Sequence, residues 1–242
     1  MSVFSIADLH LSESTEKPMD IFGARWKDHT EKLTKRWRAV VTDEDTVVIP
    51  GDISWAMTLE EAAADFRLIH SLPGKKLIGK GNHDFWWGTL SKMNAMLEAN
   101  GIDSVSFMHN NAFEVENYII CGTRGWFIDE KLQNTVGDVD YRKIVDREVL
   151  RLKKCLDEAV NLRGESEKPI LVYFHFPPVF KDFVCREIVD TLKEYGVTKC
   201  YYGHIHGVYN VPKTIEFEGI SMTLIAADYL DFIPMITNPF DF

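Results

Sequence analysis

The chain has 242 residues, of which 45% are hydrophobic, so it is long enough for one α/β domain with a well-packed core. Its formal net charge of −10 argues against a general binder of nucleic acid or of anionic membranes, because both need a basic face. The four cysteines form no CxxC pair, no apolar run is long enough to span a membrane, and the N-terminus does not resemble a signal peptide. We therefore expect a cytoplasmic protein with reduced thiols.

Short apolar runs, rich in β-branched or aromatic residues, predict five buried strands. They are Val3–Ala7, Thr46–Pro50, Lys76–Gly79, Ile170–Phe174 and Lys199–Tyr202. Longer segments with apolar residues at helical spacing predict five helices. These are Ala24–Val41, Leu59–His70, Thr89–Ala99, Asp138–Leu162 and Phe183–Tyr195. A glycine lies at or just beyond the end of each of the last four, where helix stop signals belong.

Two further segments have the pattern of antiparallel hairpins. They are Phe113–Glu116 with Tyr118–Gly122, and Thr214–Phe217 with Ser221–Ala226. The mixture of elements indicates two sheets, or one mixed sheet, covered by helices on the outside. The chain has no internal repeat, no low-complexity tract and no linker rich in Pro, Gly or Ser, so we expect one domain over residues 1–242.

Residue types that bind metals follow each of the five predicted strands. Asp8 and His10 follow the first, and their i, i+2 spacing directs both side chains to one face if the chain stays extended. The other four strands are followed by Gly51-Asp52, Gly81-Asn82-His83-Asp84, His175 and Gly203-His204-Ile205-His206. Because ligands of open α/β sheets bind beyond the carboxyl ends of the strands, we expect these side chains to meet at one edge.

The types of the candidate ligands indicate the metal chemistry. Carboxylates, imidazoles and an amide oxygen, with no thiolate, suit divalent Mn, Fe, Co, Ni or Zn. The candidate ligands are Asp8, His10, Asp52, Asn82, His175, His204 and His206. They are too many for one tetrahedral ion and suit two divalent ions that share a bridging carboxylate.

In this order, the five motifs resemble those of the calcineurin-like metallophosphoesterases, and they extend from residue 8 to residue 206. Each motif alone is weak evidence, whereas the ordered set is specific. The resemblance implies an α/β fold, a four-layer α/β/β/α sandwich in which two mixed sheets are flanked by helices. It also implies a dinuclear metal site that hydrolyses phosphate esters.

The resemblance implies a role for each residue of these motifs. One metal would bind to Asp8, His10, Asp52 and His206. The second would bind to Asp52 as the bridge, Asn82, His175 and His204. A bridging hydroxide would attack phosphorus in line. His83 would be the proton donor to the leaving group, and Asp84 would orient its imidazole and favour the cationic form.

The sequence departs from the family pattern in two places. Trp55 stands where many members have Asp, and the GDxVDRG and GNHE signatures of the Ser/Thr protein phosphatases are absent. We therefore expect a small phosphomonoester or phosphodiester as the substrate, with neither nucleic acid in bulk nor a membrane as a partner. A Ser/Thr-type protein phosphatase and a non-catalytic metal-binding interaction module are the alternatives.

Several residues near the motifs have two possible roles. Arg124 follows a predicted strand and would either clamp a substrate phosphate or form a surface salt bridge. Trp55, Trp86 and Trp87 would either line the substrate cleft or pack in the core. We expect His29, His70 and His109 at helix or strand surfaces. The substrate walls are expected within residues 12–30, 85–90, 124–137 and 176–182.

Overall fold

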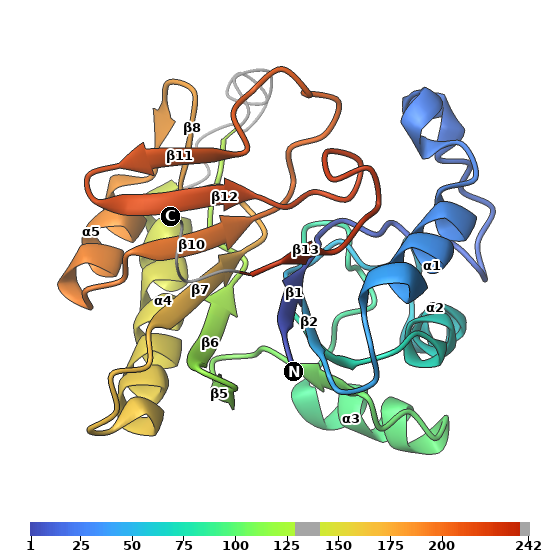
Figure 1. The fold of residues 1–242 in the computed structure, drawn as a ribbon, viewed down its shortest axis with the longest axis horizontal. Helices are drawn as coiled ribbons and strands as arrows, with labels where there is room; N and C mark the ends of the chain where they lie inside the picture. The colour runs from blue at the N-terminus through green and yellow to red at the C-terminus, as the bar shows by residue number, and fades with distance from the viewer. Residues whose placement is uncertain (129–140, 238–242) are drawn as a thin grey trace.

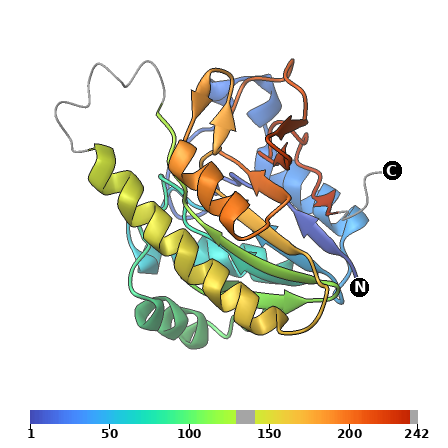
Figure 2. The same cartoon turned by 90° about the vertical axis from the view of Figure 1, so that its left-hand side faces the viewer.

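The computed structural model describes residues 1–128 and 141–237. Two β-sheets lie face to face at the centre of the molecule, and helices cover the outer face of each sheet (Figures 1 and 2). This order of layers is the predicted α/β/β/α sandwich, so the predicted fold class is confirmed. No helix in the described part of the chain is long and apolar enough to cross a membrane.

The first sheet has the strand order β13-β1-β2-β3-β4. Its strands are β1 (Val3–Ser5), β2 (Thr46–Ile49), β3 (Lys75–Ile78), β4 (Val105–Phe107) and β13 (Met235–Ile236). β1 to β4 are parallel, and β13 pairs with β1 in the antiparallel direction. Three helices cover the outer face: α1 (His29–Val40), α2 (Leu59–Ser71) and α3 (Leu90–Ala99) (Figure 1).

The second sheet has the order β11-β12-β10-β7-β6-β5. Its strands are β5 (Ala112–Val115), β6 (Tyr118–Thr123), β7 (Ile170–Phe174), β10 (Lys199–Tyr202), β11 (Thr214–Phe217) and β12 (Ile220–Leu224). The four central strands are parallel, and the two predicted hairpins supply the antiparallel edge strands β5 and β11. α4 (Tyr141–Arg163) and α5 (Arg186–Glu194) cover its outer face (Figure 2).

Alternation along the strands divides the core into three parts. In β7, Leu171 and Tyr173 face the first sheet, whereas Val172 and Phe174 face the helices α4 and α5. In β2, Val48 faces the second sheet, and its neighbours Val47 and Ile49 face α1 to α3. Because both faces of each central strand are buried, these strands have continuous apolar sequences rather than alternating ones.

Two predicted helices begin later than the sequence pattern indicates. In the segment Ala24–Val41, residues Ala24–Trp26 form a 3-10 turn, as do Asp20–Phe22 before them, and α1 begins at His29 after Asp28 in the left-handed conformation. In the segment Phe183–Tyr195, the first residues pair as a short hairpin. This hairpin consists of β8 (Val179–Phe180) and β9 (Phe183–Val184), and α5 begins at Arg186. Of the helix predicted from Asp138, residues 138–140 lie outside the described residues.

Candidate metal centre

The loops that follow β1 and β2 run side by side and are joined through their backbones. The Asp8 amide donates to the Gly51 carbonyl over 3.0 Å, and the His10 amide donates to the Asp52 carbonyl over 3.0 Å. Asp8, His10 and Asp52 have φ angles of 61°, 47° and 51°, a region that non-glycine residues rarely adopt and that is often found at functional sites. β1 ends at Ser5, so the chain at Asp8 and His10 is not extended as the argument from their i, i+2 spacing assumed. Asp8 and His10 nevertheless lie together.

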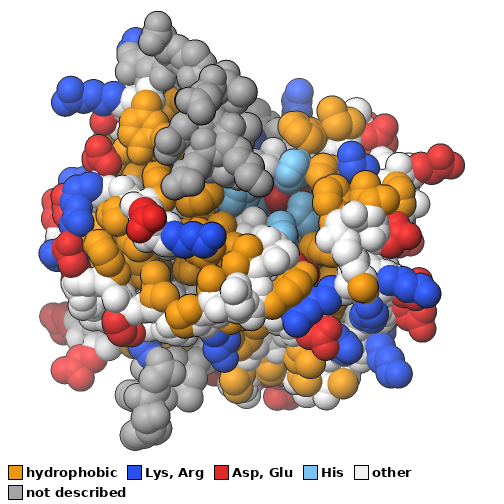
Figure 3. Space-filling model, turned by 90° about the horizontal axis from the view of Figure 1, so that it is seen from above, with side chains coloured by type: hydrophobic (Ala, Val, Ile, Leu, Met, Phe, Trp, Pro, Cys, Tyr) orange, Lys and Arg blue, Asp and Glu red, His pale blue; other side chains and the backbone are white. Residues whose placement is uncertain are grey.

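The loops after β7 and β10 bring side chains of the second sheet to the same place. The Gly203 amide donates to the His175 carbonyl over 3.1 Å. The next amide, that of His204, donates to Oδ2 of Asp8 over 2.8 Å and thereby connects the two sheets. Glycine is required at position 203, because a Cβ there would lie 2.4 Å from Oδ2 of Asp8. In Figure 3, histidine side chains gather at one place on the face seen from above.

Asp8, His10 and His206 form a first cluster whose ligand atoms lie close enough to hold one metal ion. Nε2 of His206 lies 3.8 Å from Oδ1 of Asp8 and 3.3 Å from Nε2 of His10. Nε2 of His10 also lies 3.7 Å from Oδ2 of Asp52. Imidazole nitrogens that face each other beside carboxylate oxygens are an arrangement that suits a divalent cation.

Asp8, Asp52 and His175 form a second such cluster. Nδ1 of His175 lies 3.4 Å from Oδ1 of Asp8, and its Nε2 lies 3.5 Å from Oδ2 of Asp52. The same Nε2 lies 2.6 Å from Oδ1 of Asn82. The His204 ring lies next to this cluster, with its centroid 5.1 Å from that of His175. The structure thus brings all seven predicted ligands to one edge of the two sheets.

Burial destabilises the charged forms of these groups. It raises the pKa of Asp8 to about 7 and raises the pKa of Asp52 well above its ordinary value. It also lowers the pKa values of His10 and His175 far below their ordinary range. Oδ1 of Asp8 and Nδ1 of His175 are buried and have no hydrogen-bond partner among the described residues. A divalent cation would stabilise the carboxylates and bind the neutral imidazoles, so the residues present fit a metal ion.

Asp228 is a residue of this site that the sequence motifs did not reveal. It is buried just after β12, and its Oδ1 accepts a hydrogen bond of 2.8 Å from Nδ1 of His206. Its Oδ2 accepts from the Gly207 amide and the Tyr209 hydroxyl, each over 3.0 Å. Burial acts to raise the pKa of Asp228, but its hydrogen bonds and the His206 charge lower it overall. Asp228 therefore directs Nε2 of His206 toward the cluster.

Asp84 makes a set of hydrogen bonds within the loops after β2 and β3. This buried carboxylate accepts hydrogen bonds of 2.7 to 3.4 Å from the backbone amides of Gly81, Asp52, Ile53 and Ser54 and from the Trp86 indole. Among the described contacts of Asp84, none is to the His83 ring. Burial lowers the pKa of His83, and the predicted effect of Asp84 on the His83 imidazole stays a prediction. The hydrogen bonds of Asp84 fasten the loops after β2 and β3 to each other.

His83 contacts the centre through both its backbone and its ring. Its amide donates to Oδ1 of Asp52 over 2.8 Å. Its half-buried ring lies 4.4 Å from the ring of Trp55, which stacks on His10 at 5.0 Å. Trp86 packs in the core against Phe66. The two tryptophans therefore differ, with Trp55 beside the centre and Trp86 behind it.

Other expectations for the surroundings are met only in part. Arg124 faces a cavity, where its Nη2 lies 4.0 Å from Oε1 of the buried Glu148, and Trp87 lines the same cavity. His29 is buried, not at a surface, and its Nε2 lies 3.2 Å from the His10 carbonyl. Within the expected substrate wall of residues 124–137, positions 129–137 lie outside the described residues.

Comparison with known proteins identifies the family of the chain and shows which solved structures share its fold. The family model described as calcineurin-like phosphoesterase matches residues 1–208. No curated protein matches the chain. The solved structure of TT1561 from Thermus thermophilus is 14% identical, with a TM-score of 0.56, over 94% of this chain and 89% of that chain. A second solved structure is 13% identical, with a TM-score of 0.58, over 92% of this chain and 89% of that chain. At these identities the likeness concerns the fold alone.

Proposed function

The chain belongs to the calcineurin-like phosphoesterase family, and from this we propose that it is a dinuclear-metal hydrolase of a small phosphomonoester or phosphodiester. The observation that carries the proposal is the buried Oδ1 of Asp8. It lies within 4 Å of imidazole nitrogens of both His175 and His206 but has no hydrogen-bond partner in the described part of the chain. Two carboxylates and several neutral imidazoles meet at this oxygen atom. Divalent cations bind these groups favourably, whereas the buried carboxylates are destabilised without a cation.

In this proposal the seven residues would hold two ions. Asp8, His10, Asp52 and His206 would hold the first ion. Asp52, Asn82, His175 and His204 would hold the second. Manganese, iron, zinc, nickel and cobalt all accept these ligand types. When bound, the two ions supply positive charge that stabilises a phosphate ester and lowers the pKa of water for in-line attack.

The protein's own residues position the ligands and handle the proton. Asp228 keeps the proton of His206 on Nδ1, which leaves Nε2 available as a ligand. Asp84 holds the loop that carries Asp52 through backbone amides. His83 is the proposed proton donor to the leaving group, because its half-buried imidazole lies beside the centre and its backbone contacts Asp52. An anionic substrate would raise the pKa of His83 and favour the protonated form.

The proposal is tested with purified protein, Mn²⁺ and chromogenic aryl phosphate monoesters and diesters. The protein is expected to hydrolyse at least one of them, and Asp52→Asn is expected to lose metal and activity together. Asn tolerates the left-handed backbone at this position, so the variant removes charge with little change in backbone preference. Wild-type protein without turnover across a panel of metals would favour a metal-binding interaction module. Turnover of phosphoprotein alone would favour a protein phosphatase. A cytoplasmic location and a single domain stay predictions from the sequence.

A further inference from the structure

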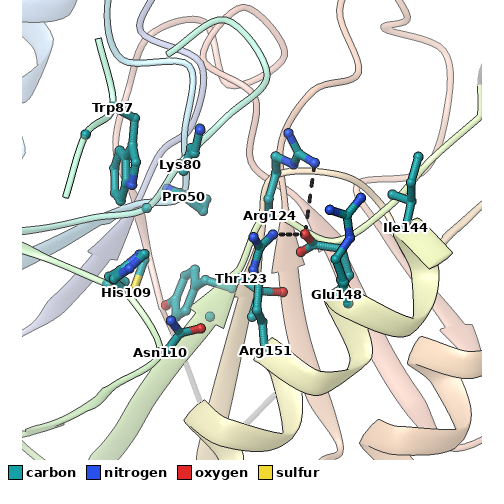
Figure 4. Close-up of a pocket in the computed structure, with 16 residues that line it drawn as sticks. Pro50, Lys80, Trp87, His109, Asn110, Thr123, Arg124, Ile144, Glu148 and Arg151 are labelled. Carbon is teal, nitrogen blue, oxygen red and sulfur yellow. Dashed lines mark hydrogen bonds and ion pairs between the residues drawn. The ribbon is translucent and has the colours of Figure 1, made fainter. Parts of the chain in front are cut away.

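A cavity of 370 Å³ has walls from both sheets and α4 (Figure 4). Two of its lining residues, Pro50 and Lys80, directly precede the metal-binding loops that begin at Gly51 and Gly81. Lys80 follows β3 and Arg124 follows β6, so each lies at the carboxyl end of a strand. Arg147, Glu148 and Arg151 come from α4. Arg151 is four residues after Arg147 and three after Glu148, and both spacings bring helix side chains next to each other. The volume is within the range of small-molecule sites.

The cavity is positively charged although the chain as a whole carries a net charge of −10. Among the described residues that line it, Lys80, Arg124, Arg147 and Arg151 are cationic, and Glu148 is the one carboxylate. Glu148 is buried and pairs with Arg151 and, at 4.0 Å, with Arg124 (Figure 4). Neither Lys80 nor Arg147 has a carboxylate within ion-pair distance in residues 1–128 and 141–237. The four cationic side chains that line the cavity therefore carry more positive charge than the single carboxylate of Glu148 neutralises.

Neighbouring groups respond to this excess of charge. His109, which also lines the cavity, has a lowered pKa, first because of burial and then because of the charges of Arg151 and Lys80. The Nε atom of Arg124 is buried and has no hydrogen-bond partner within residues 1–128 and 141–237. Guanidinium groups with unused donors, gathered in a cavity, match the geometry of phosphate and carboxylate oxygens.

The walls of the cavity continue directly into the metal-binding loops. Lys80 precedes Asn82 by two residues, which separates their Cα atoms by at most about 7 Å. The Arg124 carbonyl accepts a hydrogen bond of 2.8 Å from the amide of Phe176, the residue after His175. A molecule whose reacting phosphate lies at the metal centre would therefore have a cationic cavity within reach of its other end.

We propose that this cavity binds a second anionic group of the substrate, so that the preferred substrate is a small phosphate ester that carries a further phosphate or carboxylate. This inference rests on the proposed function, because it places the reacting phosphate at the metal centre. It goes further in naming the substrate class. Lys80 and Arg147, whose charges have no carboxylate partner among the described residues, are its main contacts, and Arg124 and Arg151 complete the wall.

The kinetic test compares simple alkyl monophosphates with alkanediol bisphosphates of the same chain length, with Mn²⁺ present and phosphate release as the readout. The bisphosphate of suitable length is expected to have a kcat/KM at least about tenfold higher, equivalent to one favourable charge contact of about 1.4 kcal/mol. Arg147→Gln is expected to remove most of that preference. Lys154→Gln, which removes a positive charge further along α4 outside the cavity, is the matched control and should keep the preference.

A binding test does not depend on turnover. Inorganic pyrophosphate is titrated into EDTA-treated protein by calorimetry, where no metal can hold it. Binding that weakens severalfold in Arg147→Gln, but not in Lys154→Gln, supports the inference. Absent binding, or equal weakening in both variants, overturns it.

The two proposals fail in distinguishable ways. If aryl phosphates are hydrolysed but monophosphates and bisphosphates have equal kcat/KM, the phosphoesterase proposal stands and the substrate inference is overturned. If no ester is hydrolysed although pyrophosphate binds the cavity, the proposed function fails and the cavity remains an anion site. A carboxylate-bearing alkyl phosphate, compared in the same assay, decides which second anion is preferred.

Discussion

Asp228→Asn tests how the metal centre is assembled. The substitution keeps the size of the side chain but replaces one oxygen with an NH₂ group. In the native protein one oxygen accepts from Nδ1 of His206, and the other accepts from Gly207 and Tyr209. An amide cannot accept on both sides. If its NH₂ group faces His206, the imidazole proton moves to Nε2, which then cannot bind a metal.

The expected magnitude follows from the general cost of losing a hydrogen-bond partner behind a metal-binding histidine. Such a loss lowers metal affinity about 10- to 100-fold, or about 1.4 to 2.7 kcal/mol. If the NH₂ group instead turns toward Gly207 and Tyr209, it faces two donors, so either orientation loses interactions. We therefore expect weaker metal binding with the fold retained, since Asp228 lies beyond the end of β12 rather than within it.

The assay is competition for Mn²⁺ or Zn²⁺ with a chelator of known affinity, with circular dichroism as the check on folding. Asp231→Asn is the matched control. It makes the same change three residues later, at an exposed side chain that pairs with Arg36 and not with the centre. Metal affinity of Asp228→Asn equal to that of the wild type would refute the reasoning. So would an equal loss in Asp231→Asn, because it would indicate a general effect of charge.

Three further predictions concern the same centre. His83→Ala is expected to keep metal content near normal and to lower turnover by about 10²- to 10⁴-fold for esters with poor leaving groups. A loss of bound metal in this variant would contradict the proposed role of His83 as proton donor. Asp8 has a pKa of about 7 in the folded protein, so between about pH 4 and about pH 7 it binds its proton in the folded state only, and its contribution to stability falls as the pH rises. The buried imidazoles give the opposite slope, because below about pH 6.5 they bind protons in the unfolded state only. In EDTA-treated protein we therefore expect the melting temperature of the wild type minus that of Asp8→Asn, which isolates the Asp8 contribution, to fall from about pH 4 to about pH 7. Excess Mn²⁺ should abolish that slope, and a flat profile without metal would refute it. Gly203→Ala is expected to cost about 1 to 3 kcal/mol of stability and to reduce metal content, because the new Cβ would lie 2.4 Å from Asp8. Gly88→Ala is the control, because a Cβ there would lie no nearer than 3.8 Å to another atom. In the same thermal and metal assays, Gly88→Ala should keep both stability and metal content.

Much of the fold was accessible from the sequence because strands buried on both faces leave continuous apolar runs. Ile170–Phe174 is such a run, and the structure has β7 over the same residues. The convergence of Asp8, Asp52 and His175 followed from one rule, that the carboxyl ends of parallel strands meet at one edge. β4 and β13 were not predicted, because segments of three and two residues carry too little pattern.

The remaining features depend on tertiary contacts that leave no local signal. Asp228 follows two alanines, and nothing in that segment indicates that it meets His206, which comes from a different loop. The cationic cavity depends on how α4 packs against the end of β6. Arg147 and Arg151 therefore look like residues of an ordinary solvated helix in the sequence. The left-handed backbone at Asp8 and His10 likewise results from the pairing of two loops rather than from either motif alone.

The origin of the candidate ligands has a consequence for folding. Asp8 and Asp52 extend from the first sheet, and His175 and His206 extend from the second. An ion held between them would act as a reversible cross-link between segments almost 200 residues apart in the chain, at the open edge of the sheet interface. Because a metal that binds only the assembled centre adds its binding free energy to folding, chelation should loosen the junction of the two halves as well as remove catalysis. The stability of the folded protein would then depend on the metal ions available to it.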